Sequence, residues 1–211
     1  MQILTLASQK GGSGKTTLAA SLAVAAYESG ERVVVVDLDP QRSLTSWGML
    51  RSAGGIVFRT IAPADLDHWV TSTRRTPVVT LCIVDTPGTF GPEVDVALRH
   101  ANCALVPVRA SVLDLWASAP TARRIAAMGR ILGFVVNAAS PVSYARTNDV
   151  IATLGENGLV GPVISERVAH RDAMATGLGV TELDPAGKAA AEIRELWAWT
   201  KQRMPTEQVS V

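Results

Sequence analysis

The sequence has few aromatic residues, almost no net charge and no long apolar run. Aromatic side chains make up 5% of its 211 residues, and 20 Lys and Arg against 19 Asp and Glu leave a formal net charge of +1. This balance argues against a histone-like protein or an acidic tail. No apolar stretch approaches the ~20 residues that a membrane-spanning helix needs. Since a basic secretory leader is also lacking, we expect a cytoplasmic protein.

Cysteine and histidine are too scarce to suggest a disulfide framework or a metal cluster. Cys82 and Cys103 each lie inside an apolar run, which predicts two buried, reduced thiols. The three histidines, at positions 68, 100 and 170, lack the spacing of metal ligands. With 47% hydrophobic and 18% charged residues, the composition is that of a folded globular chain rather than a disordered one.

Strand-length apolar runs alternate with helix-length amphipathic stretches along the chain. This pattern is typical of a single α/β domain with a mainly parallel, twisted sheet flanked by helices. We predict strands near 2–7, 32–37, 78–84, 103–108, 131–136 and 160–164, and a weaker one at 56–61. The predicted helices lie near 15–29, 43–52, 63–73, 93–100, 114–129, 143–156, 167–176 and 185–203. The domain should span residues 1–204, followed by a loose tail over 205–211.

A glycine-rich octet follows the first predicted strand and opens the first predicted helix. Residues 10–17 read Lys-Gly-Gly-Ser-Gly-Lys-Thr-Thr, and this is the context that a phosphate-binding loop requires. Backbone N–H groups and the helix N-terminus favour phosphate oxygens, Lys15 offers a charge to the terminal phosphates, and the Thr16 hydroxyl is placed to ligate Mg²⁺. The loop residues expected to contact the nucleotide are Gly11, Gly12, Ser13, Gly14, Lys15, Thr16 and Thr17.

Aspartates stand where two of the predicted strands end. Asp37 and Asp39 follow a run of four valines, and Asp85 closes the run before Thr86. Carboxyl ends of strands face the ligand crevice of open α/β sheets, so Asp85 has the position of a Walker B carboxylate for Mg²⁺. Asp37 and Asp39 are two residues apart and can act differently, one in the hydration shell of the metal and the other on an attacking water. By itself, Asp-x-Asp-Pro is also a common turn and helix cap.

The loop departs from the usual G-x-x-x-x-G-K-[ST] pattern in an informative way. Gln9 replaces the first glycine, and a second lysine, Lys10, precedes Gly11. This combination resembles the deviant Walker A loop of the ParA/MinD family of ATPases. Segments 37–47, 106–115 and 177–185 extend the resemblance, which is nearest to the short plasmid-partition ParA proteins. GTP is disfavoured as the nucleotide, because none of the four lysines is followed by an aspartate two residues later.

The resemblance implies a slow, Mg²⁺-dependent ATPase that forms a sandwich homodimer when ATP binds. Such dimers bind DNA without sequence preference, associate with the nucleoid, and position or partition a plasmid, a chromosome region or a protein assembly. A ParB-like or other small partner protein stimulates their hydrolysis. Longer members carry an N-terminal winged-helix module that reads operator DNA. This sequence starts at the first core strand, so we expect any DNA binding to be non-specific.

The resemblance also assigns roles to individual residues. It makes Lys10 the lysine that reaches the nucleotide of the partner subunit, and Lys15 the phosphate lysine. Thr17 becomes an α-phosphate contact, and Asp39 orients the attacking water. Asn137 stands where the family has an adenine-contacting residue, although an isolated asparagine is equally typical of a cap. The expected metal shell consists of Thr16, Asp37 and Asp85.

Two surfaces are possible for attachment of such an ATPase. For DNA, the family favours the late basic residues, although each cluster is also typical of an ordinary solvated face. The alternative is a MinD-like membrane-associated ATPase with an amphipathic C-terminal helix. Trp197 and Trp199 point about 200° apart on a helix and make no single apolar stripe, so membrane binding is disfavoured and Trp197 should pack in the core. The candidate DNA-contacting residues are Arg167, Arg171, Lys188, Arg194, Lys201 and Arg203.

Overall fold

A parallel sheet forms the centre of the molecule in the computed structural model, which describes residues 1–75, 78–89 and 91–204. Its strand order is β3-β2-β4-β1-β5-β6-β7, with β8 pairing with β6, and the pairs formed by these strands within the described residues are all parallel. The predicted fold class, a single α/β domain with helices around a parallel sheet, is therefore confirmed. The expected tail over 205–211 lies outside the described residues.

The sheet is most apolar in its middle strands, as a sheet covered on both faces must be. Every residue of β2 and β4 is buried, including the aspartate that ends each of them. The strands are β1 (Gln2–Leu6), β2 (Val33–Asp37), β3 (Val57–Arg59), β4 (Leu81–Asp85), β5 (Cys103–Val108), β6 (Ile131–Ala139), β7 (Leu159–Val160) and β8 (Ile164–Ser165).

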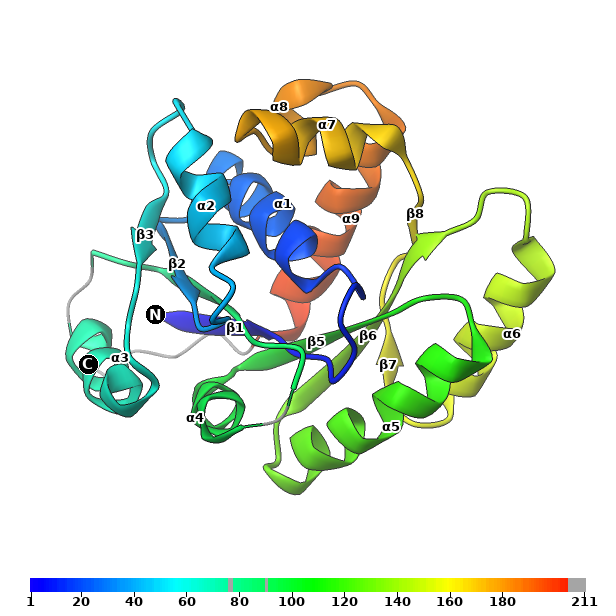
Figure 1. The fold of residues 1–211 in the computed structure, drawn as a ribbon, viewed down its shortest axis with the longest axis horizontal. Coiled ribbons are helices and arrows are strands. Elements are labelled where there is room, and N and C mark those ends of the chain that lie inside the picture. Colours follow the sequence, from blue (N-terminus) through cyan, green and yellow to red (C-terminus); the bar gives the residue numbers. More distant parts are fainter. Residues whose placement is uncertain (76–77, 90, 205–211) are drawn as a thin grey trace.

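Helices lie on both sides of the sheet (Figure 1). One side carries α1 (Lys15–Glu28), α2 (Ser43–Leu50), α7 (Val168–Thr176), α8 (Val180–Leu183) and α9 (Lys188–Arg203). The other side carries α3 (Leu66–Arg74), which follows a 3-10 turn at Pro63–Asp65, and then α4 (Pro92–His100), α5 (Val112–Ala127) and α6 (Tyr144–Gly155). None of the helices in the described part of the chain combines the length and the apolar character needed to cross a bilayer.

Helix α1 packs on the sheet and beside α9, and small side chains allow this close approach. Ala19 and Ala23 are fully buried and belong to the same core cluster as Leu4 and Ile193. Trp197 of α9 is buried in that cluster, and its indole N–H donates to Ser29 Oγ at 2.8 Å. The expected core position of Trp197 is therefore confirmed, and the polar edge of its ring is satisfied.

The element boundaries differ from the predicted ones by up to a few residues, and β4 and α9 each begin three residues later than expected. The strand expected over 160–164 is split into β7 and β8 around Gly161 and Pro162, because proline has no N–H for the ladder. Strand β6 continues to Ala139, three residues past its expected end. Helix α8 forms within the segment expected as a loop, where the Glu182 carboxylate accepts the Gly179 N–H at 2.8 Å. Both cysteines are buried free thiols, as predicted.

Candidate nucleotide-binding site

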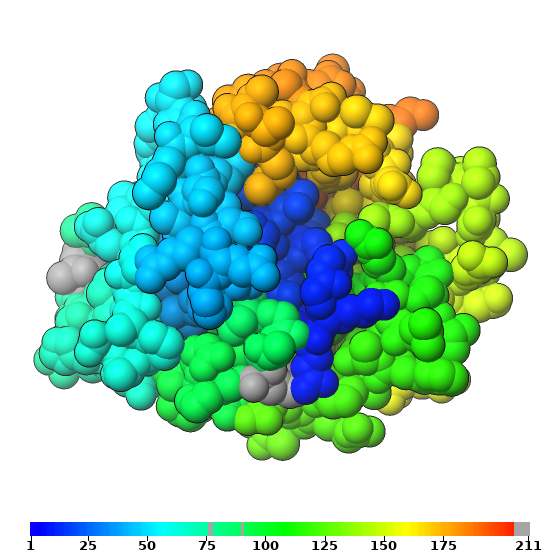
Figure 2. Space-filling view, in the orientation of Figure 1, coloured from blue at the N-terminus to red at the C-terminus, as the bar shows by residue number. Residues whose placement is uncertain are grey.

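A cleft of about 1000 Å³ opens at the carboxyl ends of the central strands. The loop after β1 lines it together with residues that follow β2 and β4, the end of β6, and one side of α7. Figure 2 shows the hollow where the dark blue loop, the cyan α2 region and the orange-yellow α7 meet. This is the edge at which open α/β sheets bind their ligands. The motifs found in the sequence therefore converge on one cavity.

Gly14 gives the predicted phosphate loop its shape at the start of α1. Its backbone is left-handed, with φ of 94°, and a Cβ atom there would lie 2.1 Å from Asn137 Nδ2. Asn137 donates from that same nitrogen to the Ser13 carbonyl at 2.8 Å. Only glycine satisfies both the backbone angle and the close approach. Asn137 lines the cleft and holds the loop, and its expected contact with adenine stays a prediction.

Lys15 is enclosed by the loop that it would use to bind phosphate. Its side chain is buried, and Nζ donates to the Ser8 carbonyl at 3.3 Å and to the Lys10 carbonyl at 3.5 Å. Burial lowers the pKa of Lys15, while the nearby charges of Asp85 and Asp39 act in the opposite direction. A buried ammonium whose hydrogen bonds to described residues are long contacts with carbonyls would gain from a nearby phosphate oxygen.

Thr16 and Asp85 form the part of the site that suits a divalent cation. The Thr16 hydroxyl donates to Asp85 Oδ2 at 2.7 Å, whereas Asp85 Oδ1 is buried without a hydrogen-bond partner among the described residues. Burial raises the pKa of Asp85 to about 7, even though the Thr16 hydrogen bond lowers it. A bound cation would supply the missing partner and favour the ionised form. The residues present therefore fit Mg²⁺.

Protein groups alone do not complete that metal site. Within residues 1–75, 78–89 and 91–204, no group of three or more His, Cys, Asp or Glu side chains could hold a metal ion. Mg²⁺ is usually held by one or two carboxylates together with waters and substrate phosphates. A cation at Thr16 and Asp85 would therefore share its coordination with the phosphates of the ligand, and when bound it would neutralise the charge that develops on them.

Asp37, the last residue of β2, and Asp39, two residues later, have different surroundings. Asp37 is the register partner of Asp85 on the neighbouring strand, and its carboxylate accepts the Asp39 N–H at 3.1 Å and the Thr45 N–H and hydroxyl at 2.8 and 2.9 Å. It thus holds the turn from β2 into α2. Asp39 lines the cleft, and its Oδ1 accepts the Gln41 N–H at 2.9 Å. Asp39 therefore faces the cleft directly, and the expected place of Asp37 in the metal shell stays a prediction.

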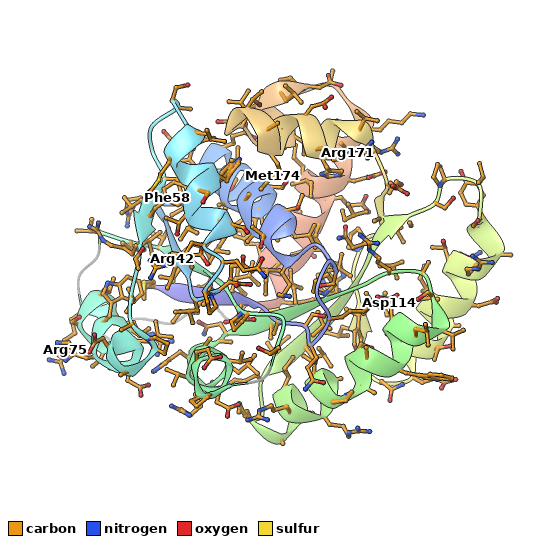
Figure 3. All side chains as sticks on the ribbon, in the orientation of Figure 1. Arg42, Phe58, Arg75, Asp114, Arg171 and Met174 are labelled. Atoms are coloured by element: carbon orange, nitrogen blue, oxygen red, sulfur yellow. The ribbon has the colours of Figure 1, made fainter. Side chains whose placement is uncertain are left out.

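Lys10 points away from the phosphate cage of its own loop. Its ammonium lies 2.8 Å from Asp114 Oδ2 in the first turn of α5, and its side chain is 39% exposed. Asp114 is buried and is also hydrogen-bonded by the Ser111 hydroxyl. Figure 3 labels Asp114 at this end of α5, beside the phosphate loop. The two lysines of the loop are therefore held in different ways, Lys15 by carbonyls of the loop and Lys10 by a carboxylate of another element.

Helix α7 forms the wall of the cleft opposite the Asp39 turn. His170, Arg171 and Met174 line the cleft from it, and Figure 3 shows Arg171 and Met174 on this helix. Both ring nitrogens of His170 are buried and have no hydrogen-bond partner among the described residues. Burial lowers the pKa of His170, Glu192 raises it and Arg167 lowers it further. The ring is therefore a neutral part of the cleft wall near pH 7.

The six candidate DNA residues are not equally available. Arg167 lines the cleft and pairs with Glu192 at 2.6 Å, and Lys201 pairs with Glu31 at 2.7 Å. The Arg203 guanidinium lies 3.9 Å from the centre of the Trp199 ring, and Arg194 donates to the Pro185 carbonyl at 2.7 Å. Lys188 and Arg171 are exposed, and their side chains make no hydrogen bond or ion pair with a described residue. Their contact with DNA stays a prediction.

Several residues of the site were not singled out from the sequence. Arg109, His170 and Met174 line the cleft, and Asp114 holds Lys10. Arg109 and Asp114 follow β5, so their position after the carboxyl end of a strand was the available signal. His170 and Met174 are four residues apart on α7, which places them on one helix face. Nothing in the sequence alone indicated that this face borders the phosphate loop.

The fold and site define a phosphate-loop nucleotide-binding protein of the parallel α/β class. The family profile described as the CobQ/CobB/MinD/ParA nucleotide binding domain matches residues 4–180, most of the chain. The chain belongs to this family, and within it to the ParA/MinD ATPases, as the resemblance predicted.

Individual relatives extend this similarity over most of the chain. The maintenance of carboxysome distribution protein A of Halothiobacillus neapolitanus is 29% identical over 204 residues, which cover 90% of this chain and 91% of that protein. Protein ParA of Rhizobium radiobacter is 30% identical over 182 residues, or 81% of each chain. Among solved structures, the septum site-determining protein MinD complexed with Mg-ADP from Pyrococcus horikoshii has a TM-score of 0.80 at 17% identity, covering 95% of this chain and 96% of that one. This last likeness concerns the fold.

Proposed function

We propose that this protein is a positioning ATPase that closes into a homodimer around Mg²⁺ and ATP. In the proposed cycle, the dimer binds DNA without sequence preference, and a small partner protein stimulates hydrolysis and release. The cargo is a plasmid, a chromosome region or a protein assembly. Support comes from the family and from relatives named for carboxysome distribution and for ParA. The protein would be associated with the nucleoid in its ATP-bound state.

The position of Lys10 is the observation that carries this proposal. Lys15 is enclosed by its own loop, so the phosphates of a bound nucleotide have one lysine already. Lys10 is held by Asp114 on the open side of the loop and is partly exposed. In this position Lys10 is poorly placed to contact phosphates bound by its own loop. It is accessible to a second chain that approaches the exposed side of the loop. The proposed recipient is the nucleotide of the partner subunit.

The other residues of the cleft supply the proposed chemistry. Thr16 and Asp85 would hold Mg²⁺ with the phosphates, since Asp85 Oδ1 lacks another partner. Asp39 would orient the water that attacks the terminal phosphate, and its position at the cleft leaves it available for this. Phosphoryl transfer depends mainly on such positioning and on charge stabilisation. We expect ATP turnover to be slow in the absence of the small partner protein, because in the proposed cycle that protein stimulates hydrolysis.

Sedimentation velocity with a non-hydrolysable ATP analogue and Mg²⁺ tests the dimer. We expect the wild-type chain to sediment as a dimer with the analogue and as a monomer without it. Lys10→Ala should keep nucleotide binding and lose most of the dimer, whereas Lys15→Ala should lose nucleotide binding itself. Lys201→Ala is the matched control, because that lysine is already paired with Glu31, which lies between α1 and β2. A wild-type chain that binds the analogue and stays monomeric would contradict the proposal.

A further inference from the structure

The start of α5 carries an exposed apolar patch that consists of Val112, Leu113 and Trp116. All three residues are exposed, and Trp116 is 70% exposed. Residues three and four apart lie on one face of a helix, so Trp116 shares its face with the two aliphatic side chains. On the opposite side of α5, Ile125 is buried in a cluster with Val106 of β5. The apolar patch therefore faces away from the core, and contiguous exposed apolar surface of this kind marks an interaction site.

Two further exposed apolar residues, Val142 and Tyr144, lie just before and at the start of α6. A hollow of about 280 Å³ between the starts of α5 and α6 is lined by Asp114 and Ser143, among other residues. Arg109 lines both this hollow and the nucleotide cleft. Because β5 and β6 are parallel, the helices that follow them both begin at the carboxyl edge of the sheet, where the phosphate loop lies. The exposed apolar side chains therefore gather beside the nucleotide cleft.

Lys10 joins this surface to the phosphate loop. Its ammonium lies 2.8 Å from Asp114 Oδ2, and Asp114 directly follows Leu113 in the first turn of α5 (Figure 3). The Cα–Cβ bonds of a helix lean toward its N-terminus, so Trp116, in the next turn, leans toward the same end. A second chain that receives Lys10 must therefore approach the start of α5 as well.

The phosphate loop alone offers little surface for a stable contact. Gly11 and Gly12 are exposed, but they have no side chains. A stable dimer usually buries about 800 Å² of each chain around an apolar centre, and a single tryptophan buries roughly 150–250 Å². The apolar patch, next to the loop, supplies the area that the glycines lack. In a dimer with two-fold symmetry, the patch of each chain would take part, so its contribution is doubled.

We propose that the apolar patch forms the apolar part of the interface with a second copy of this chain. The inference rests on the proposed function, in which Lys10 reaches the nucleotide of the partner subunit. Trp116 is the anchor of this interface, since truncation of a central aromatic residue causes some of the largest losses of affinity. The patch lies outside the residues that line the cleft. It therefore stabilises the dimer without contributing to nucleotide binding by the single chain.

Sedimentation velocity over a range of protein concentrations, with Mg²⁺ and a non-hydrolysable ATP analogue, gives the dissociation constant of the dimer. Trp116→Ala should raise this constant at least about tenfold, and Leu113→Ala should raise it roughly threefold. Leu159→Ala is the matched control, because it removes an exposed leucine at the start of β7, on the opposite edge of the sheet. It should stay within about twofold of wild type. Binding of the analogue to the single chain, measured at protein concentrations too low for dimers, should be unchanged in all three variants.

Acrylamide quenching of tryptophan fluorescence tests the same contact without a truncation. Trp116→Phe keeps an aromatic ring at this position and should still form the dimer. The difference between wild type and this variant therefore isolates the emission of Trp116. We expect that emission to become shielded from acrylamide when the analogue is added.

Three results would overturn the inference while the ATP-dependent dimer of the proposed function stands. They are a wild-type dissociation constant in Trp116→Ala, an equal loss in Leu113→Ala and Leu159→Ala, and Trp116 emission that stays accessible to acrylamide in the dimer. The patch would then be left for a protein other than a second copy. A wild-type chain that binds the analogue and stays monomeric would instead contradict the proposed function, and the inference with it.

Discussion

At the scale of single residues, the Asp39 turn separates a structural carboxylate from an accessible one. Asp37 accepts three hydrogen bonds from Asp39 and Thr45, whereas Asp39 faces the cleft. Two aspartates with nearly the same position in the sequence thus have different tasks. Substituting each of them in turn should give different kinds of defect, one in turnover and one in stability.

Asp39→Ala should abolish most of the ATPase activity and keep ATP binding. A group that orients the attacking water contributes roughly 10²–10⁴-fold to such a reaction, so we expect phosphate release to fall by about that factor. The dimer formed with ATP should persist for longer, because hydrolysis no longer ends it. Phosphate release and gel filtration with ATP measure the two effects. Wild-type turnover in this variant would remove Asp39 from the water-orienting role.

Asp114→Asn should make dimer formation easier. The asparagine can still accept a hydrogen bond from Ser111, but it removes the charge that holds Lys10. A partly exposed ion pair contributes about 0.2–1 kcal/mol, so the concentration of ATP analogue needed for half-maximal dimer should fall up to about fivefold. Sedimentation over a range of analogue concentrations measures this. In a chain that already carries Lys10→Ala, Asp114→Asn should have no further effect on dimer formation. If Asp114→Asn alone weakens the dimer, then Asp114 does not restrain Lys10 from reaching a second chain.

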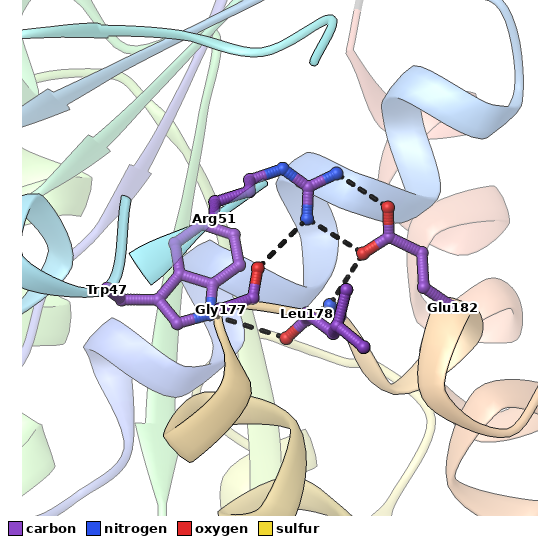
Figure 4. A network of polar contacts seen from close by, with 6 residues as sticks. Trp47, Arg51, Gly177, Leu178 and Glu182 are labelled. Atoms are coloured by element: carbon purple, nitrogen blue, oxygen red, sulfur yellow. Dashed lines mark hydrogen bonds and ion pairs between the residues drawn. The ribbon is translucent and has the colours of Figure 1, made fainter. Parts of the chain in front are cut away.

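At the scale of elements, the contact of α2 with α7 and α8 should be sensitive to acid. The Arg51 side chain, which follows α2, is only 2% exposed and donates to both carboxylate oxygens of Glu182 at 2.7 and 2.5 Å (Figure 4). Burial alone would raise the pKa of Glu182, but hydrogen bonds from Arg51 and the Gly179 N–H hold it below its usual value. A carboxyl group with a lowered pKa in the folded state stabilises the protein above its ordinary pKa, and this stability is lost as the pH falls through the folded value. The contribution is therefore fully present at pH 7.

Glu182→Gln should lower the free energy of unfolding by roughly 2–3 kcal/mol at pH 7, because Arg51 is left buried without a charged partner. The difference from wild type should shrink below about pH 4.3, where Glu182 of the unfolded wild-type chain begins to be protonated, and it should become small below the lowered pKa of Glu182 in the folded chain. Urea unfolding at pH 7, 5 and 3.5 measures it. Glu195→Gln, on the exposed side of α9, is the matched control and should change little. A difference that is the same at all three pH values would contradict the role of the Glu182 charge.

The positions of the strands, and which strands are buried on both faces, can be predicted from the sequence because each depends on a short stretch of neighbouring residues. The run Val33–Val36 is buried on both faces, as its composition predicts, and the aspartates that end β2 and β4 reach the same edge of the sheet. Helix α8 and the Arg51–Glu182 pair could not be predicted in the same way. The pair joins residues 131 positions apart, and the sequence around Arg51 or Glu182 has no pattern that indicates the other residue. Non-local polar contacts therefore account for most of what the sequence does not reveal about the site.

At the scale of the whole molecule, ion pairing determines which basic residues remain for a nucleic acid. The net charge of +1 gives no general attraction to DNA, so binding needs a local group of unpaired cations. Lys201 and Arg167 are paired with carboxylates. Lys188, the first residue of α9, is exposed, and its side chain makes no hydrogen bond or ion pair with a described residue. A dimer would present two copies of it.

Lys188→Ala should therefore weaken ATP-dependent DNA binding equally for unrelated sequences. Each lysine–phosphate contact contributes about one unit to the slope of log affinity against log salt, so loss of the contact in both chains should reduce the slope by about two. Fluorescence anisotropy with two unrelated duplexes, each at several salt concentrations with a non-hydrolysable ATP analogue, measures this. Lys201→Ala should leave the slope unchanged, because Glu31 already neutralises that lysine. If Lys188→Ala does not alter the salt dependence of DNA affinity, the DNA contact lies on another face of the protein. If the wild-type protein binds DNA equally well without nucleotide, DNA binding does not depend on dimer formation.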